Sequence, residues 1–166
     1  MSGIDAECLV IGVGNPDRAD DGAGPLVASR LQALRPPRVR VTMRSGNLLS
    51  LLDDWAGARA VVVVDAAAPL ARPGTIHRWA PGSADLPRSS PSSSTHGLGV
   101  AEVLALAAQL GRLPPKLVLY AIEGASFDPG APMTPAVRRA SVMLARRLGA
   151  GRGIAGAAAP GPSRGR

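Results

Sequence analysis

The sequence has almost no cysteine and very few aromatic residues. Cys8 is the only cysteine among 166 residues, so one chain cannot form an internal disulfide, an iron–sulfur cluster or a thiolate zinc site. Its neighbours in ECLVIGVG are apolar, which predicts a buried thiol and not a nucleophile. Aromatic residues make up 2% of the chain, whereas proteins that bind single-stranded nucleic acid stack bases on such side chains. This composition argues against that class of function.

Acidic residues are missing from the C-terminal segment. Residues 138–166 hold seven arginines and no Asp or Glu, while residues 1–137 hold twelve basic and twelve acidic residues. The formal net charge of +7 therefore arises in the last helix and the tail. Composition reveals no basic face on the body of the protein, and we expect no nucleic-acid partner.

The chain also lacks a signal-peptide pattern and any apolar run near the ~20 residues of a membrane span. We therefore expect a soluble cytoplasmic protein with no membrane partner. The length suits one domain, which we place at residues 1–150. Residues 151–166 have too few large apolar side chains to order themselves, so they are predicted to form a disordered basic tail. Nothing in the sequence demands more than a monomer.

Strand and helix patterns alternate along the chain. Buried strands are predicted in ECLVIGV, AVVVVDAA and PKLVLYAIEG, and half-exposed strands in RVRVTM and PGTIHRWA. Helices are predicted from about Gly22 to Leu34, in NLLSLLDDWAG, in HGLGVAEVLALAAQLG, and from the N-cap Thr134 to about Leu148. Such alternation indicates a layered α/β fold, in which ligands gather beyond the carboxyl ends of the strands.

The loop IGVGNPDRADDGAG, residues 11–24, resembles a phosphate-binding loop but carries three aspartates. Gly12 and Gly14 fit a dinucleotide fingerprint, yet Asp17 stands where its third glycine belongs. Asp20 and Asp21 would repel a pyrophosphate at the start of the helix. The loop therefore favours a cation and makes a nucleotide-binding module improbable. Alternatively, the two aspartates serve only as helix N-cap and first-turn acid.

Two further candidate ligands follow predicted strands or loops. Asp65 ends the strand VVVVD, and His96 follows a Ser-rich loop at the start of a helix. Each has a simpler interpretation, as a turn-capping acid and as a surface histidine. Together with Asp21 they offer two carboxylates and one imidazole at one edge of the sheet. That donor set suits a borderline divalent ion such as Ni²⁺ or Zn²⁺.

Four segments resemble the [NiFe]-hydrogenase maturation proteases. They are IGVGNPDRADDGAGPLVASRL, SGNLLSLLDDWAGARAVVVVDAA, STHGLGVAEVLALA and LVLYAIEGASFDPGAPMTPAV, in the family's order. The resemblance implies a three-layer α/β/α sandwich, similar to phosphorylase/hydrolase folds. Its twisted five-stranded sheet is mixed, with one antiparallel strand and helices on both faces.

The resemblance also implies an activity. The family's enzymes are endopeptidases that remove a C-terminal extension from a [NiFe]-hydrogenase large-subunit precursor after nickel insertion. The family's metal-contacting positions fall on Asp21, Asp65 and His96, which we take as both the metal-binding and the catalytic residues. The ion is the precursor's own nickel, although Zn or Cd is able to occupy such a site in vitro. The alternative is a non-catalytic nickel-binding or docking chaperone for the same subunit.

Two positions depart from the family's pattern. Some members have Glu where this chain has Asp21, and because Asp20 precedes it the sequence leaves open which aspartate coordinates. Asn47 stands in a turn that is glycine-rich in the family.

The remaining polar residues are given ordinary roles. Glu123 is interpreted as a surface acid at a strand end, with a substrate groove as the alternative, and His77 as an exposed strand residue. Arg18 and Arg88 are interpreted as solvated arginines that alternatively meet an acidic precursor tail. The serines at 89–94 lie in a Pro-broken loop, so no Ser-His-Asp triad is predicted.

Overall fold

The computed structural model describes residues 8–83, 86 and 98–154. Its centre is a five-stranded sheet in the order β2-β1-β3-β5-β4. The parallel strands are β1 (Cys8–Val13), β2 (Val39–Arg44), β3 (Ala60–Ala67) and β5 (Lys116–Glu123), and β4 (Ile76–Trp79) pairs antiparallel with β5. The predicted mixed sheet with one antiparallel strand is confirmed.

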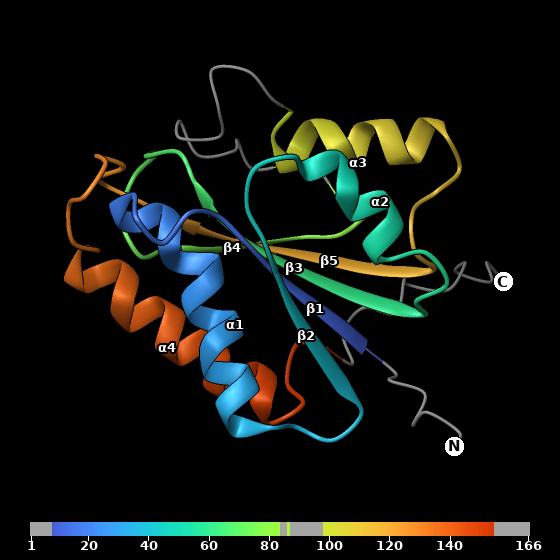
Figure 1. The fold of residues 1–166 in the computed structure, drawn as a ribbon, viewed down its shortest axis with the longest axis horizontal. Coiled ribbons are helices and arrows are strands. Elements are labelled where there is room, and N and C mark those ends of the chain that lie inside the picture. Colours follow the sequence, from blue (N-terminus) through green and yellow to red (C-terminus); the bar gives the residue numbers. More distant parts are fainter. Residues whose placement is uncertain (1–7, 84–85, 87–97, 155–166) are drawn as a thin grey trace, which may run out of the picture.

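Helices cover both faces of this sheet (Figure 1). On one face lie α1 (Ala23–Leu34) and α4 (Pro135–Gly149). On the other face lie α3 (Val100–Gln109) and the short α2 (Leu51–Asp54). The architecture is therefore the predicted three-layer α/β/α sandwich. No helix in the described ranges has the length and apolar character needed to cross a bilayer.

The alternation of side chains along the central strands builds two cores. On β3, Val62 and Val64 pack toward α1 and α4, whereas Val61 and Val63 pack toward α2 and α3. Because successive side chains of a strand point to opposite faces, a continuous valine run fills both layers at once. This placement also sends Asp65, the next odd-numbered residue of β3, to the α2 and α3 side.

The predicted element boundaries hold to within a few residues. A 3₁₀ turn, Ala19–Gly22, precedes α1, and another, Leu48–Ser50, precedes α2. Thr134 is the N-cap of α4 with Pro135 at the first position, as predicted, but its hydroxyl does not cap the helix. Past α4, Tyr120 Oη donates to Gly153 O at 3.3 Å and Ile154 packs against the core. The rest of the predicted tail, residues 155–166, lies outside the described residues.

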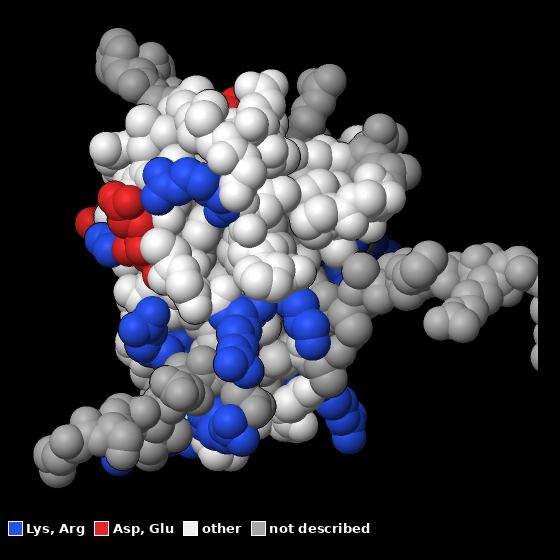
Figure 2. Space-filling model, turned by 90° about the vertical axis from the view of Figure 1, so that its right-hand side faces the viewer, with Lys and Arg blue, Asp and Glu red and all other residues white. Residues whose placement is uncertain are grey.

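Balanced charge totals conceal a separation of charge in space. Arg38, Arg59 and Lys116 line a cavity of about 640 Å³ at the N-terminal edge of the strands. Figure 2 shows Lys and Arg side chains gathered on this end of the molecule. Composition did not reveal this basic face, because a count of residues along the chain does not record which end of the sheet they reach.

Candidate functional site

A cavity of about 250 Å³ opens at the carboxyl ends of β1 and β3. β2 pairs with β1 on one side, and β3, the next strand along the chain, pairs with β1 on the other side. The strand order therefore changes direction between β1 and β3. Ligands of open α/β sheets bind in that crevice. We call this space the site cavity. Its lining comprises Val13, Gly14, Asn15, Arg18, Asp21, Ser45, Gly46, Leu48, Asp65 and Leu98.

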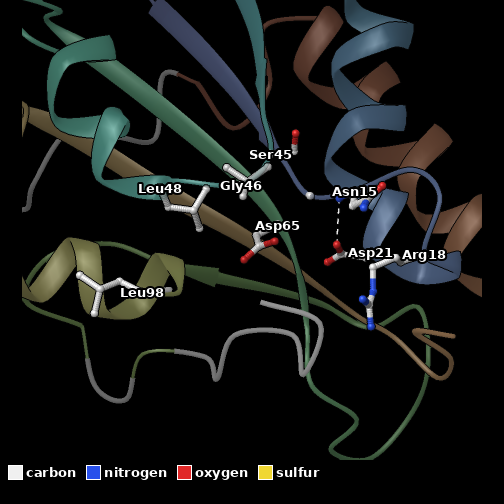
Figure 3. Close-up of a pocket in the computed structure, with 10 residues that line it drawn as sticks. Asn15, Arg18, Asp21, Ser45, Gly46, Leu48, Asp65 and Leu98 are labelled. Carbon is white, nitrogen blue, oxygen red and sulfur yellow. Dashed lines mark hydrogen bonds between the residues drawn. The ribbon is translucent and has the colours of Figure 1, made fainter. Parts of the chain in front are cut away.

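Asp65 lies near the end of β3 and faces the site cavity (Figure 3). Only 6% of the residue is exposed, and its Oδ1 accepts a hydrogen bond from Ala66 N at 2.9 Å. Burial, and after it the negative charge of Asp21, raise the pKa of Asp65 well above its usual value, although the Ala66 bond opposes the shift. The structure thus brings Asp21 and Asp65 together, as the sequence predicted, and leaves this pair short of positive charge.

Asp21 reaches the same cavity from the 3₁₀ turn that follows β1. Its Oδ2 accepts a hydrogen bond from Asn15 N at 2.8 Å, drawn as the dashed line in Figure 3. The turn begins at Ala19, which has φ of 49°. That backbone conformation costs a non-glycine residue of order 1–3 kcal/mol and persists only where the surrounding structure enforces it.

Asp20 has a different environment from Asp21, although the two are adjacent. It is fully buried, and its Oδ2 accepts hydrogen bonds from Ala125 N and Ser126 N at 2.8 and 3.0 Å. Its Oδ1 accepts from Thr134 N at 2.7 Å, and the Thr134 hydroxyl also lies within 3.0 Å. Asp20 does not line the site cavity. Its carboxylate is occupied by backbone donors, so of the two neighbouring aspartates Asp21 is the one that faces the site cavity.

The glycines of the loop have a packing role. Gly14 has φ of +140°, and a Cβ there would lie 2.0 Å from Asp21 O. A Cβ on Gly24 would lie 2.3 Å from Val13 O and 2.4 Å from Val64 O. These contacts let the start of α1 press against the sheet and place Asp21 beside β3. The resemblance to a phosphate loop reflects this close approach of helix and strand.

His96 and Arg88 lie outside the described residues, as do the serines at 89–94. Leu98, two positions after His96, lines the site cavity. Within the ranges that the structure describes, no three His, Cys, Asp or Glu side chains form a group able to hold a metal ion.

Two interpretations of polar residues at the neighbouring strands are wrong. Glu123 is not a surface acid: it is 1% exposed and accepts from Leu70 N and Ala71 N at 2.7 and 2.5 Å. His77 is only partly exposed, and its Nε2 lies 3.2 Å from Glu123 Oε2. Burial raises the pKa of Glu123, but the bonds from Leu70, His77, Ala71 and Arg72 outweigh it and lower the pKa below the usual value. Glu123 therefore fastens the loop that follows β3.

Cys8 is buried, as predicted, and burial raises the pKa of its thiol to about 11. A thiol with that pKa is not an effective nucleophile. Asn47 lies near the site cavity and accepts from Leu49 N at 3.1 Å through its Oδ1. It therefore caps the 3₁₀ turn that carries the cavity residue Leu48.

The sequence did not predict that Asn15 and Arg18 line the site cavity. Arg18 lines the site cavity and lies beside Asp21, on the side away from Asp65, in Figure 3. Its position within NPDRADD, between the glycine loop and the acidic pair, was the available signal.

Comparisons with known proteins agree on one family. A family model described as hydrogenase maturation protease matches residues 27–148. The hydrogenase expression/formation protein HupD of Thiocapsa roseopersicina is 34% identical over 128 residues, or 75% of this chain. The chain spans 57% of the length of that relative.

Solved structures give the same result. The [NiFe] hydrogenase maturation protease HycI of Thermococcus kodakarensis is 25% identical with a TM-score of 0.67, over 87% of this chain and 91% of its own. The hydrogenase maturating endopeptidase HybD of Escherichia coli is 26% identical with a TM-score of 0.62, over 87% of this chain and 93% of its own.

Proposed function

Because this chain belongs to the hydrogenase maturation protease family, we propose that it is an endopeptidase acting on a [NiFe]-hydrogenase large-subunit precursor. In this proposal it removes the C-terminal extension of the precursor after nickel insertion. The observation that supports it best is the pair Asp21 and Asp65, two buried carboxylates facing one cavity. Their mutual repulsion is relieved when a divalent cation enters between them.

The nickel is part of the substrate in this proposal. Asp21 and Asp65 contact it, and His96 supplies a third donor. Leu98, which follows His96 by two positions in the sequence, lines the site cavity. Two oxygens and one imidazole nitrogen match the preference of Ni²⁺ and leave positions open for the precursor's own ligands.

The reaction is hydrolysis of one peptide bond. The precursor's nickel, held at Asp21 and Asp65, polarises the scissile carbonyl or lowers the pKa of a water molecule. A carboxylate accepts the proton of that water as its oxygen bonds to the carbonyl carbon. The carbon–nitrogen bond then breaks and the same proton passes to the leaving amine. An empty precursor lacks the ion that docks here, so it is not cut.

Cleavage of a nickel-loaded precursor tests this proposal. Loaded and nickel-free large-subunit precursor from the same organism are incubated with the protein, and their masses are followed by intact-protein mass spectrometry. We expect loss of a C-terminal peptide only from the loaded precursor. Asp21→Asn and His96→Ala should prevent loss of the C-terminal peptide. The side chain of Asp53 on α2 is 87% exposed, so Asp53→Asn is the control and should cleave like wild type.

The remaining outcomes separate the alternatives. A precursor that binds without any change of mass supports a docking chaperone and contradicts the endopeptidase. Equal cleavage of loaded and empty precursor contradicts recognition through nickel.

A further inference from the structure

A second cavity adjoins the site cavity at Arg18. This outer cavity has a volume of about 530 Å³ and lies between residues 15–18 and residues 129–131. Its size is within the range of about 300–1,000 Å³ found for ligand pockets. Among the described residues, Asn15 and Arg18 are the two that line both cavities. A peptide that leaves the site cavity on this side must therefore pass Arg18.

The guanidinium of Arg18 is left without a partner in the described part of the chain. Its Nε has no contact with solvent and no hydrogen-bond partner there. Its backbone is fixed, since Arg18 N donates to Asn15 O at 3.2 Å and Arg18 O accepts from Asp21 N at 3.0 Å. A buried N–H without a partner destabilises a protein. The Arg18 side chain lines both cavities, so a ligand oxygen that entered them would meet a cation whose Nε donor is unused within the described residues.

The walls of the outer cavity are fastened to each other. Gly130 N donates to Asp17 O at 2.7 Å, and Asp20 N donates to Ser126 O at 2.9 Å. The buried Asp20 carboxylate binds the same segment through Ala125 and Thr134. These bonds fix the outer cavity before any ligand arrives, which lowers the entropy lost on binding.

We propose that Arg18 binds a carboxylate of the precursor segment that runs from the site cavity into the outer cavity. This inference rests on the proposed function and assigns Arg18 the role of a specificity residue. A guanidinium matches a carboxylate through two parallel hydrogen bonds, which are stronger than bonds to neutral acceptors. Asp17 lines the same cavity, but it is exposed, so water and salt screen its charge.

Steady-state cleavage of the nickel-loaded precursor tests the role of Arg18. Arg18→Ala should raise KM about tenfold and leave kcat within about twofold, because the bond contributes to binding and not to the chemical step. Arg18→Lys keeps the positive charge but loses the two parallel hydrogen bonds. Its KM should therefore lie between those of wild type and Arg18→Ala. Arg30→Ala, an exposed arginine on the outer side of α1, is the matched control and should keep the wild-type KM.

Two altered precursors identify the source of the carboxylate. One has the acidic side chains of its extension changed to amides, and the other carries a C-terminal amide made by semisynthesis. The effect of Arg18→Ala should vanish with whichever precursor lacks the bound carboxylate. If the effect of Arg18→Ala stays the same with both, Arg18 does not bind a carboxylate and the assignment is overturned.

Failure of this inference differs from failure of the proposed function. If wild-type protein cuts the loaded precursor and Arg18→Ala has the wild-type KM, only the role of Arg18 is refuted. If wild-type protein cuts no loaded precursor, both fall. A fall in kcat together with a lower melting temperature in both Arg18→Ala and Arg18→Lys would mean that Arg18 is structural, and it would overturn the inference.

Discussion

In the described part of the chain, four buried carboxylates lie at the same edge of the sheet, and they divide into two pairs. Asp20 and Glu123, exposed by 0% and 1%, accept hydrogen bonds from backbone groups of distant loops. Asp21 and Asp65, each exposed by 6%, face the site cavity and accept one backbone bond apiece.

The difference between the pairs separates structure from function. A buried anion whose oxygens accept several N–H groups stabilises the fold. Two buried anions that face each other across a cavity destabilise it, as the raised pKa of Asp65 records. Such destabilised groups are typical of functional sites. The predictions below, apart from one on Cys8, change a member of one pair at a time.

The largest expected effect is on cleavage. Asp65→Asn should lower the rate of cleavage of nickel-loaded precursor by roughly 100-fold or more, because the metal-bound carbonyl or water loses a charged contact. Single-turnover kinetics measure the change, with Asp53→Asn as control. A rate within a few-fold of wild type would remove Asp65 from the site.

Asp20→Ala should lower the free energy of unfolding by about 3 kcal/mol, because it leaves the buried N–H groups of Ala125, Ser126 and Thr134 without acceptors. Urea denaturation measures the loss. The exposed Asp17 supplies the matched variant, and Asp17→Ala should change stability by no more than about 0.5 kcal/mol. Equal losses for the two variants would contradict a fastening role for Asp20.

The two pairs should differ in the sign of their pH dependence. The folded-state pKa of Glu123 lies below the usual 4.5, so its stabilisation is present above that pH and is lost as the pH falls through the folded value. Glu123→Gln should therefore be less stable than wild type at pH 7, and the gap should narrow in acid. Urea denaturation at a series of pH values measures this gap.

In the same experiment, the stability difference between Asp65→Asn and wild type should have the opposite sign. Its pKa is raised in the folded protein, so the ionised group destabilises the fold at neutral pH and ceases to do so as acid protonates it. Asp65→Asn should be more stable than wild type at pH 7 in metal-free buffer, and this gain should shrink toward pH 4. A stability difference from wild type of the same sign for Glu123→Gln and Asp65→Asn at pH 7 would contradict the division into pairs.

The smallest effect is expected at Cys8. Burial raises its thiol pKa to about 11, so Cys8→Ala should leave the cleavage rate within about twofold of wild type. The intact thiol should also resist alkylation at pH 8 until urea unfolds the protein. Rapid labelling of the folded protein would show that the thiol is accessible.

Most of the fold could be predicted because its signals are local. The valine run that becomes β3, the helix stop after Leu34 and the Thr134–Pro135 helix start are all read within a few residues. The strand-end position of Asp65 follows from the same reading.

The division between Asp20 and Asp21 could not be predicted. The N–H groups that donate to the Asp20 carboxylate lie more than 100 positions away from it in the sequence. No local sequence pattern connects them to Asp20. For the same reason the sequence alone predicts a surface acid at Glu123, since the partners of its carboxylate come from the loop after β3. The sequence identified which acids reach the sheet edge, and only the structure identifies which of them are already hydrogen-bonded.

The most direct test compares Asp20→Asn with Asp21→Asn in one set of preparations, by urea denaturation and by single-turnover cleavage of nickel-loaded precursor. We predict that Asp21→Asn is at least as stable as wild type, because it removes one of two facing charges, and that it loses cleavage by roughly 100-fold or more. Asp20→Asn should lose about 2 kcal/mol, because an amide NH₂ would face backbone N–H groups, and should keep cleavage within about tenfold while folded. Loss of cleavage without loss of stability in Asp20→Asn, or the reverse in Asp21→Asn, would contradict the account.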